Sequence, residues 1–348
     1  MGLEITWFCL ICVLWAGYFM LEGFDFGVGM LLPVVGKSQE ERGRMIESIG
    51  PVWDGNEVWL VVAAGATFAA FPVWYATMFS GFYIALLLIL VFLVTRVVSF
   101  EWRGKAESPR WKAVWTSVNT IASYCAPLLW GIALANLLHG VPIGSDQNFA
   151  GDFGDLFSGY TILAGIAVVL LFAAHGAVFL RLRTTGDLYA RVRRAAALLT
   201  PAAAVVGTGF LGWTLVVASD RNDKGVFPGI LPVLVAAISA LAAIWAVRAA
   251  RDRLAFVATA ATIVAVVVTL FVSLYPRVMV SNPDFANSLT IDNASSEDYT
   301  LKVMTVVAAV LIPVIVLYQA WTYRVFRARI TGTPVGSPAD LLGRKPGE

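Results

Sequence analysis

Eight stretches of the chain carry no charged side chain, and segments with charged residues separate them. The stretches that lack Asp, Glu, Lys and Arg are residues 5–21, 58–95, 113–145, 156–180, 195–219, 225–247, 254–276 and 303–323. A helix that crosses a bilayer needs about 20 mostly apolar residues. Seven stretches therefore predict one membrane-spanning helix each. Residues 58–95 are long enough for two, with a turn at residues 71–75, where Pro72 would break the helix. The pattern predicts an all-α polytopic membrane protein with nine transmembrane helices.

Charge is scarce over the whole chain. Of 348 residues, 59% are hydrophobic and 14% are charged, whereas about 25% of a soluble globular chain is charged. This composition excludes nucleic-acid binding through a basic face, disorder and a large water-facing domain. Residues 1–330 are therefore predicted to form a single integral membrane domain, followed by a loose cytoplasmic tail over residues 331–348. The three cysteines lie inside apolar stretches and predict neither a disulfide framework nor a zinc site.

The basic residues are concentrated on one side of the predicted membrane. Connections one, three, five and seven, together with the C-terminal tail, hold 21 of the 25 Lys and Arg residues, including Arg96, Arg181 and Arg183. The opposite side holds only Arg221, Lys224, Arg277 and Lys302. The positive-inside rule then predicts the N-terminus outside and the C-terminus inside.

Two pairs of carboxylates stand near the predicted inner side. Glu22 and Asp25 are three residues apart where the first predicted span continues past residue 21, and Asp54 and Glu57 are three apart at the start of the second. Residues at this spacing share a helix face. Ionisable groups inside a membrane are costly and indicate function. The four carboxylates therefore suggest a proton uptake route from the cytoplasm, and Trp53, Gly55 and Asn56 surround the second pair as a supporting motif.

Each pair also has a structural interpretation. Asp54-x-x-Glu57 fits a capping box at a helix start, and this interpretation is as good as a role in proton transfer. Capping cannot explain Asp25, which lies within a span. Its structural alternatives are a buried pair with an arginine or exposure at the inner interface.

The two histidines are too few and too far apart for a multi-haem centre, because haem iron is usually held by His, Met or Cys. His175 lies inside the fifth predicted span and is interpreted as a hydrogen-bonded interior residue or a member of a proton network. His139 lies at the outer end of the fourth span and is interpreted as an interface residue. The chain is therefore predicted to ligate no haem and no other metal.

Several segments, spread over nearly the whole chain, resemble subunit II of bacterial cytochrome bd-type quinol oxidases. They are residues 23–30, 51–60, 79–83, 136–142, 182–188, 275–276, 287–290 and 301–305. The segment Trp53-Asp54-Gly55-Asn56 is the most specific of them.

The resemblance implies two four-helix bundles plus one peripheral helix, in the cytoplasmic membrane of a bacterium. It implies a partner subunit I that holds b-type and d-type haems, with none ligated by subunit II. Asp25 and Asp54 would then belong to a proton path from the cytoplasm toward the haem that reduces O2 to water. The proton gradient would arise without conformational pumping. Some members hold a quinone in subunit II, ubiquinone or menaquinone, and small single-span subunits and membrane lipids are further partners.

A proton-coupled secondary transporter is the alternative function that the carboxylates alone leave open. Transporters usually consist of paired halves with broken helices near the membrane midplane. This chain shows no half-repeat, and its carboxylates lie near one leaflet, so the pattern favours the oxidase subunit.

Overall fold

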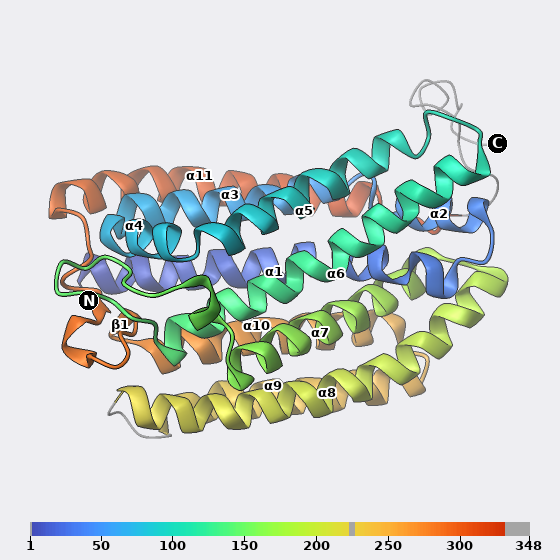
Figure 1. The fold of residues 1–348 in the computed structure, drawn as a ribbon. Coiled ribbons are helices and arrows are strands. Elements are labelled where there is room, and N and C mark those ends of the chain that lie inside the picture. The colour runs from blue at the N-terminus through green and yellow to red at the C-terminus, as the bar shows by residue number, and fades with distance from the viewer. Residues whose placement is uncertain (1, 223–226, 331–348) are drawn as a thin grey trace.

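Long helices run side by side along one common direction (Figure 1). The computed structural model describes residues 2–222 and 227–330. Its α-helices are α1 (Leu3–Val35), α2 (Gln39–Ile49), α3 (Trp53–Ala70), α4 (Pro72–Gly81), α5 (Tyr83–Trp102), α6 (Pro109–His139), α7 (Gly159–Arg183), α8 (Gly186–Asn222), α9 (Phe227–Arg248), α10 (Asp252–Leu274) and α11 (Asp298–Val325). The predicted tail over residues 331–348 and Lys224 lie outside the described residues.

The helices within the described ranges are those of a polytopic membrane protein, as predicted. Eight of them are long and apolar enough to cross a membrane: α1, α5, α6, α7, α8, α9, α10 and α11. Helix α3 has 18 residues, and its first turns hold Asp54, Asn56 and Glu57, which lower its hydrophobicity. Nine spans therefore stay a prediction, with α3 as the ninth.

The long uncharged stretch 58–95 breaks where the sequence predicts, but the turn is a helix. Helix α3 ends at Ala70, and Pro72 opens α4. Proline is favoured at the first turn of a helix, where its missing N–H group costs nothing. A second break at Phe82 separates α4 from α5, so three helices occupy a segment for which two were predicted.

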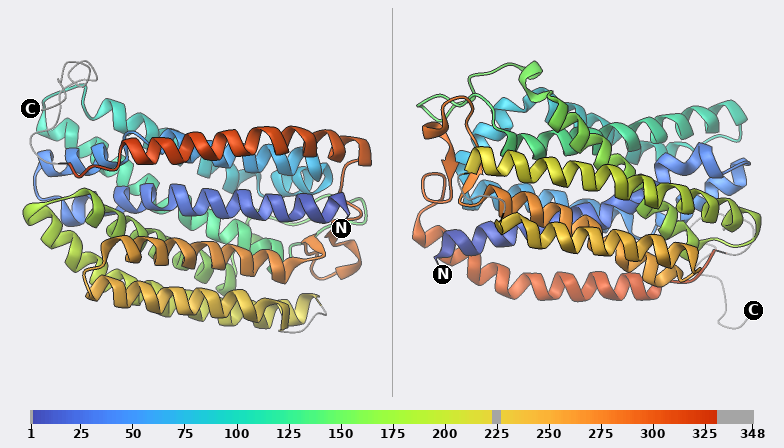
Figure 2. Two further views of the ribbon diagram at one scale, coloured as in Figure 1. Left: turned by 180° about the vertical axis from the view of Figure 1, so that it is seen from behind. Right: turned by 90° about the horizontal axis from the view of Figure 1, so that it is seen from below.

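The helices pack as two groups that share α1 as a neighbour. Helices α7, α8, α9 and α10 contact one another, while α1 contacts α3 and α6, and α5 packs on α6. Helix α1 also contacts α7 and α10, which joins the groups. Helix α11 packs on α1 and α3, and both views of Figure 2 place it at the edge of the bundle beside α1.

Glycine lets the two groups approach closely at the crossing of α1 and α7. A Cβ atom built at Gly27 would lie 2.8 Å from the Cα atom of Gly176, well inside van der Waals contact. Small residues permit such backbone contact between membrane helices. The crossing places Glu22 and Asp25 of α1 deep in the bundle.

The two ends of the bundle differ, and the all-helical prediction missed a hairpin at one of them. Strands β1 (Arg277–Met279) and β2 (Leu289–Thr290) pair antiparallel, and Ser281 bridges to Val141 in the connection that follows α6. The strands are too short for the alternating pattern that identifies a strand in a sequence. We call this the hairpin end; the N-terminus lies there (Figure 1). The opposite end, with α2, is the α2 end.

Three of the arginines that were assigned to connections are buried inside helices instead. Arg96 belongs to α5, and Arg181 and Arg183 belong to α7; the side chains of Arg96 and Arg181 are fully buried. Each of these two has an acidic partner, Glu22 for Arg96 and, at 2.6 Å, Asp252 for Arg181. Paired charges are tolerated inside a helix bundle. The uncharged stretches therefore end before the helices do.

The carboxylate of Glu41 links helix α2 to α8. Glu41 accepts hydrogen bonds from the backbone N–H groups of Lys37, at 2.7 Å, and Ser38, and it pairs with Arg191 of α8. Arg191 also donates to the carbonyl of Val35 at 2.8 Å. Burial alone would raise the pKa of Glu41, but these hydrogen bonds and the charge of Arg191 hold it below its usual value.

Candidate functional site

A cluster of buried polar side chains lies where α1, α3, α5 and α11 meet. Glu22 and Asp25 of α1 and Arg96 of α5 have no solvent exposure. The Arg96 guanidinium forms an ion pair with the Glu22 carboxylate. Both charges are desolvated, so each would be strongly destabilised without the other.

Arg96 is held by aromatic rings as well as by Glu22. Its guanidinium carbon lies 4.3 Å from the centre of the Phe26 ring and 5.4 Å from that of Phe100. The faces of these rings attract a cation. Within the described part of the chain, the Nε and Nη2 atoms of Arg96 have no hydrogen-bond partner, and neither do Glu22 Oε2 and Asp25 Oδ1.

One positive charge therefore serves two buried carboxylates. If both carboxylates were ionised, the buried cluster would carry a net charge of minus one, which a membrane interior disfavours. The cluster becomes neutral when one of the two carboxylates takes up a proton. Glu57 of α3 is half-buried, and its charge also acts on Glu22 and Arg96. The arrangement is suited to bind and release a proton.

Asn56 links Asp25 to α3 and α11. Its Nδ2 atom donates to Asp25 Oδ2 at 2.7 Å and lies 3.4 Å from the carbonyl oxygen of Leu21. Its Oδ1 atom accepts from Gln319 Nε2 at 3.0 Å and from the Tyr323 hydroxyl at 2.8 Å. The buried carboxamide thus has partners on both sides.

Further polar groups continue from Arg96 toward the α2 end. The Ser99 hydroxyl donates to the Arg96 carbonyl at 2.5 Å, and Asn119 of α6 donates to Ser99 Oγ at 2.8 Å. Nearer to the α2 end, Arg103 donates to Thr116 Oγ1 at 3.1 Å and to Gln39 of α2. We call the five residues that lead to Arg96 the polar lane: Ser99, Asn119, Thr116, Arg103 and Gln39.

The structure brings together only some of the residues that the sequence predicts for the site. Glu22, Asp25 and Asn56 lie in the buried cluster, and Glu57 lies at its margin. Asp54 and Gly55 are exposed, on a different face of α3 from the one on which Asn56 meets Asp25. The Trp53 ring packs 5.5 Å from that of Phe100, so it supports the start of α3.

The capping interpretation of Asp54 is wrong. Helix α3 begins at Trp53, its N-cap residue is Val52, and no side chain caps it by a hydrogen bond. Asp54 therefore lies inside the first turn, where its negative charge still favours the helix N-terminus. The arginine pair considered for Asp25 belongs to its neighbour Glu22.

Sequence reasoning missed Arg96 and the two members of the cluster on α11, Gln319 and Tyr323. Arg96 was counted with a connection because it ends an uncharged stretch, although the apolar pattern resumes at Val97 and Val98. That resumption was the available signal. Gln319 and Tyr323 lie in the last apolar stretch, and no sequence pattern relates them to Asn56.

His175 is an interior residue with both ring nitrogens engaged. Its Nδ1 atom lies 2.7 Å from Thr259 Oγ1 and its Nε2 atom 3.2 Å from the carbonyl oxygen of Met20, while its ring stacks on Phe256 at 4.7 Å. His139 is half-buried at the hairpin end, 5.7 Å from the Tyr160 ring.

The fold and the buried acid–base cluster define a polytopic helical membrane protein with ionisable groups in its interior. Residues 3–326 match the family described as cytochrome bd terminal oxidase subunit II, and the chain belongs to this family. The resemblance seen in the sequence is thereby confirmed.

Similar proteins agree with this assignment. Cytochrome bd ubiquinol oxidase subunit 2 of Bacillus subtilis is 42% identical and aligns over 95% of this chain and 97% of its own. Cytochrome bd-I ubiquinol oxidase subunit 2 of Escherichia coli is 38% identical, over 94% and 95%. A chain of the bd oxidase from Geobacillus thermodenitrificans shares the fold, with a TM-score of 0.68 at 20% identity, over 94% of this chain and 99% of that chain.

Membership in the family sets the class of activity. The chain is a subunit of a bd-type quinol oxidase, an oxidoreductase complex of the respiratory chain, and its membership implies a partner subunit I. This assignment favours the oxidase over the secondary transporter that the carboxylates alone left open.

The Arg96–Glu22 pair should be essential for folding. We expect Arg96→Met to lower the stability of the complex by about 3–5 kcal/mol, because it leaves a buried carboxylate without its cation. Replacing Glu22 by Gln in the same variant should restore part of this loss. The thermal unfolding midpoint of the purified complex measures both effects.

The exposed pair between Lys302 and Asp298 provides a control. Lys302→Met should change stability by no more than about 1 kcal/mol, since exposed ion pairs contribute little. If Arg96→Met were as mild as Lys302→Met, Arg96 would not be the counter-charge of the cluster.

Proposed function

We propose that this chain is the haem-free subunit of the oxidase and lines the route by which protons from the cytoplasm reach the oxygen-reducing haem in subunit I. It has no catalytic activity alone. The observation that carries the proposal is the buried cluster, in which Glu22 and Asp25 share the single guanidinium of Arg96. Such a cluster changes its proton content at low cost, because its total charge stays near zero.

The polar lane supports the direction of the route. Gln39, Arg103, Thr116, Asn119 and Ser99 lead from the α2 end toward Arg96. In the proposed route, protons pass along this lane, with water, to Glu22 and Asp25. At the start of α3, Glu57 at the margin of the cluster and the exposed Asp54 near it act as further proton acceptors. The haem in subunit I supplies the oxygen chemistry, so that protons taken from inside contribute to a proton gradient without conformational pumping.

We also propose nine spans, with α3 as the ninth, the N-terminus outside and the C-terminus inside, in the bacterial cytoplasmic membrane. The connections at residues 36–38, 103–108, 184–185 and 249–251 lie at the α2 end, and the N-terminus lies at the hairpin end (Figure 1). Most basic residues flank the α2 end, which faces the cytoplasm in this arrangement. Subunit I, small single-span subunits and lipids are the partners along the apolar faces.

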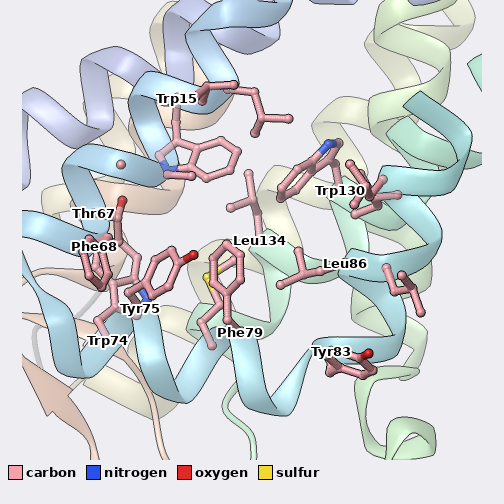
Figure 3. A pocket seen from close by; sticks show the side chains of 18 of the residues that line it. Trp15, Thr67, Phe68, Trp74, Tyr75, Phe79, Tyr83, Leu86, Trp130 and Leu134 are labelled. Atoms are coloured by element: carbon pink, nitrogen blue, oxygen red, sulfur yellow. The ribbon is translucent and has the colours of Figure 1, made fainter. Parts of the chain in front are cut away.

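A large apolar cavity supports a further part of the proposal, a bound quinone. The cavity lies between α3, α4, α5 and α6 and has a volume of about 560 Å³. Figure 3 shows the rings of Trp15, Tyr75, Phe79 and Trp130 around it. Within the described residues, the indole N–H groups of Trp74 and Trp130 are buried without a hydrogen-bond partner. A ubiquinone or menaquinone would offer carbonyl oxygens to these donors and an apolar tail to the walls.

The proton route is tested by removing one titratable group at a time. Asp25→Asn keeps the shape and polarity of the side chain but cannot ionise. Quinol-driven oxygen consumption per haem d should therefore fall at least about tenfold, which corresponds to an increase of about 1.4 kcal/mol in the activation free energy.

Asp54→Asn should cause a smaller fall in oxygen consumption, because Glu57 remains beside it. Asp298→Asn, in an exposed pair at the hairpin end, is the matched control. Normal turnover in both Asp25→Asn and Asp54→Asn would contradict the proposal, and loss of haem content would indicate an assembly role.

The haem-free character of the chain has its own test. Both His175 ring nitrogens already have partners at hydrogen-bond distance, which supports a structural role. In an assembled His175→Ala complex, all haem absorption bands should therefore keep their intensity. Selective loss of one band would identify His175 as a haem ligand.

The quinone is tested by filling the cavity. Leu134 lines it, whereas Leu198 of α8 is exposed on the bundle surface. Quinone extracted from the purified complex, measured per haem, should decrease in Leu134→Trp and stay unchanged in Leu198→Trp, because only the first ring enters the cavity. Equal quinone content in both variants would place any bound quinone elsewhere.

A further inference from the structure

Asn56 stands at the end of a chain of hydrogen bonds whose direction is fixed by an indole. The Trp59 Nε1 atom lies 2.7 Å from Gln319 Oε1, and Gln319 Nε2 lies 3.0 Å from Asn56 Oδ1. An indole N–H group can only donate a hydrogen bond. Gln319 must therefore turn its oxygen to Trp59 and its amino group to Asn56, which fixes the oxygen of Asn56 on the α11 side.

Tyr323 adds a second hydrogen bond in the same orientation. Its hydroxyl group donates to Asn56 Oδ1 at 2.8 Å, so this oxygen accepts two hydrogen bonds from α11. If the Asn56 carboxamide flipped, its amino group would face the amino group of Gln319 and that hydrogen bond would be lost, while the Tyr323 hydroxyl would have to accept instead of donate. Because both donors hold the oxygen, the amino group of Asn56 faces Asp25 Oδ2 at 2.7 Å.

The orientation of Asn56 determines which form of Asp25 is favoured. An amino group directed at a carboxylate stabilises the ionised form, whereas a carbonyl oxygen directed at it would stabilise the protonated acid. Since Asp25 Oδ2 accepts from Asn56, the better place for an exchangeable proton is Oδ1, which is buried and has no hydrogen-bond partner in the described ranges.

We propose that Trp59, Gln319 and Tyr323 are positioning residues that keep the Asn56 amino group on Asp25 and thereby direct its exchangeable proton to Oδ1. The proposal rests on the proton-transfer role given to Asp25 above. It also explains a spacing within the segment of residues 51–60. Asn56 and Trp59 are three residues apart on α3, and Gln319 and Tyr323 are four apart on α11, so each pair shares a helix face.

The peripheral helix α11 thus acts on the buried site. Its surface is otherwise largely apolar and exposed, with Val314, Leu317 and Tyr318 more than half exposed. Its polar side chains meet the bundle where Asn56 and Trp59 stand. Movement of α11 away from α3 would release Asn56 and change the proton affinity of Asp25 without altering any carboxylate.

The double variant Gln319→Met/Tyr323→Phe tests this inference in the intact complex, because it removes both donors and keeps the side-chain volumes similar. Freed to turn its oxygen toward Asp25, Asn56 would favour the protonated acid by about tenfold, which corresponds to about one pH unit. The pH profile of oxygen consumption per haem d should therefore shift upward by about one unit. The infrared band of the protonated Asp25 carboxyl, identified by its absence in Asp25→Asn, should persist to correspondingly higher pH.

Two variants serve as controls. Tyr318→Phe removes an exposed hydroxyl from the same helix and should leave the profile unchanged. Gln319→Glu still accepts from Trp59 but cannot donate to Asn56 when ionised, so combined with Tyr323→Phe it should also shift the profile upward.

The outcomes separate this inference from the proposed function. If Asp25→Asn slows turnover while the double variant keeps the wild-type pH profile and infrared band, the positioning role is wrong and the proton route stands. If Asp25→Asn and Asp54→Asn both have normal turnover, the proton route fails. If the infrared band persisted to higher pH in the double variant, this result would still establish that α11 positions Asn56.

Discussion

One guanidinium has to serve two carboxylates inside a bundle of helices that excludes water. Arg96 and Glu22 can be buried only together, and their pairing fixes the part of α5 that faces α1. Asp25, one turn further along α1, is left without a cation of its own and depends on Asn56. The start of α3 supplies Asn56 to Asp25, and α11 packs where Gln319 and Tyr323 bind Asn56. The cluster therefore joins four helices by electrostatic balance and leaves room for one exchangeable proton.

Other ion pairs in the molecule have a different character. Arg181 lies 2.6 Å from Asp252, and Arg329 lies 3.7 Å from the same carboxylate, near the α2 end. In that group arginines outnumber carboxylates, so no carboxylate lacks a counter-charge. Glu41 and Arg191 form another matched pair. These contacts hold helix ends in place, whereas the Arg96 cluster has an excess of acid in the middle of the bundle, and the proposed proton role rests on this difference.

The hydrogen-bond chain from Trp59 to Asp25 shows how a neutral network can control a charged one. Each member has a fixed orientation because its neighbour has only one way to bond. Three of the members belong to α3 and α1, and one belongs to α11 at the edge of the bundle. A helix with few buried residues can therefore influence the centre of the site through two side chains.

The sequence by itself determined most of the architecture and half of the site. Uncharged stretches of about 20 residues identified the predicted spans, because charged side chains are costly in the hydrocarbon core of a bilayer. The break before Pro72 could be predicted because proline interrupts a helix. Glu22 and Asp25 could be recognised because carboxylates in a span are rare, and the motif around Trp53 and Asn56 led to the family. Only the tertiary structure decided that Arg96 is buried, that Glu22 rather than Asp25 is its partner, and that Asn56 rather than Asp54 meets Asp25. It alone showed the two-stranded hairpin, and it joined Gln319 to Asn56 across 263 positions of sequence separation. Side-chain contacts between helices that are distant in the sequence depend on which helix faces pack together, and a local pattern of residues does not show which faces these are.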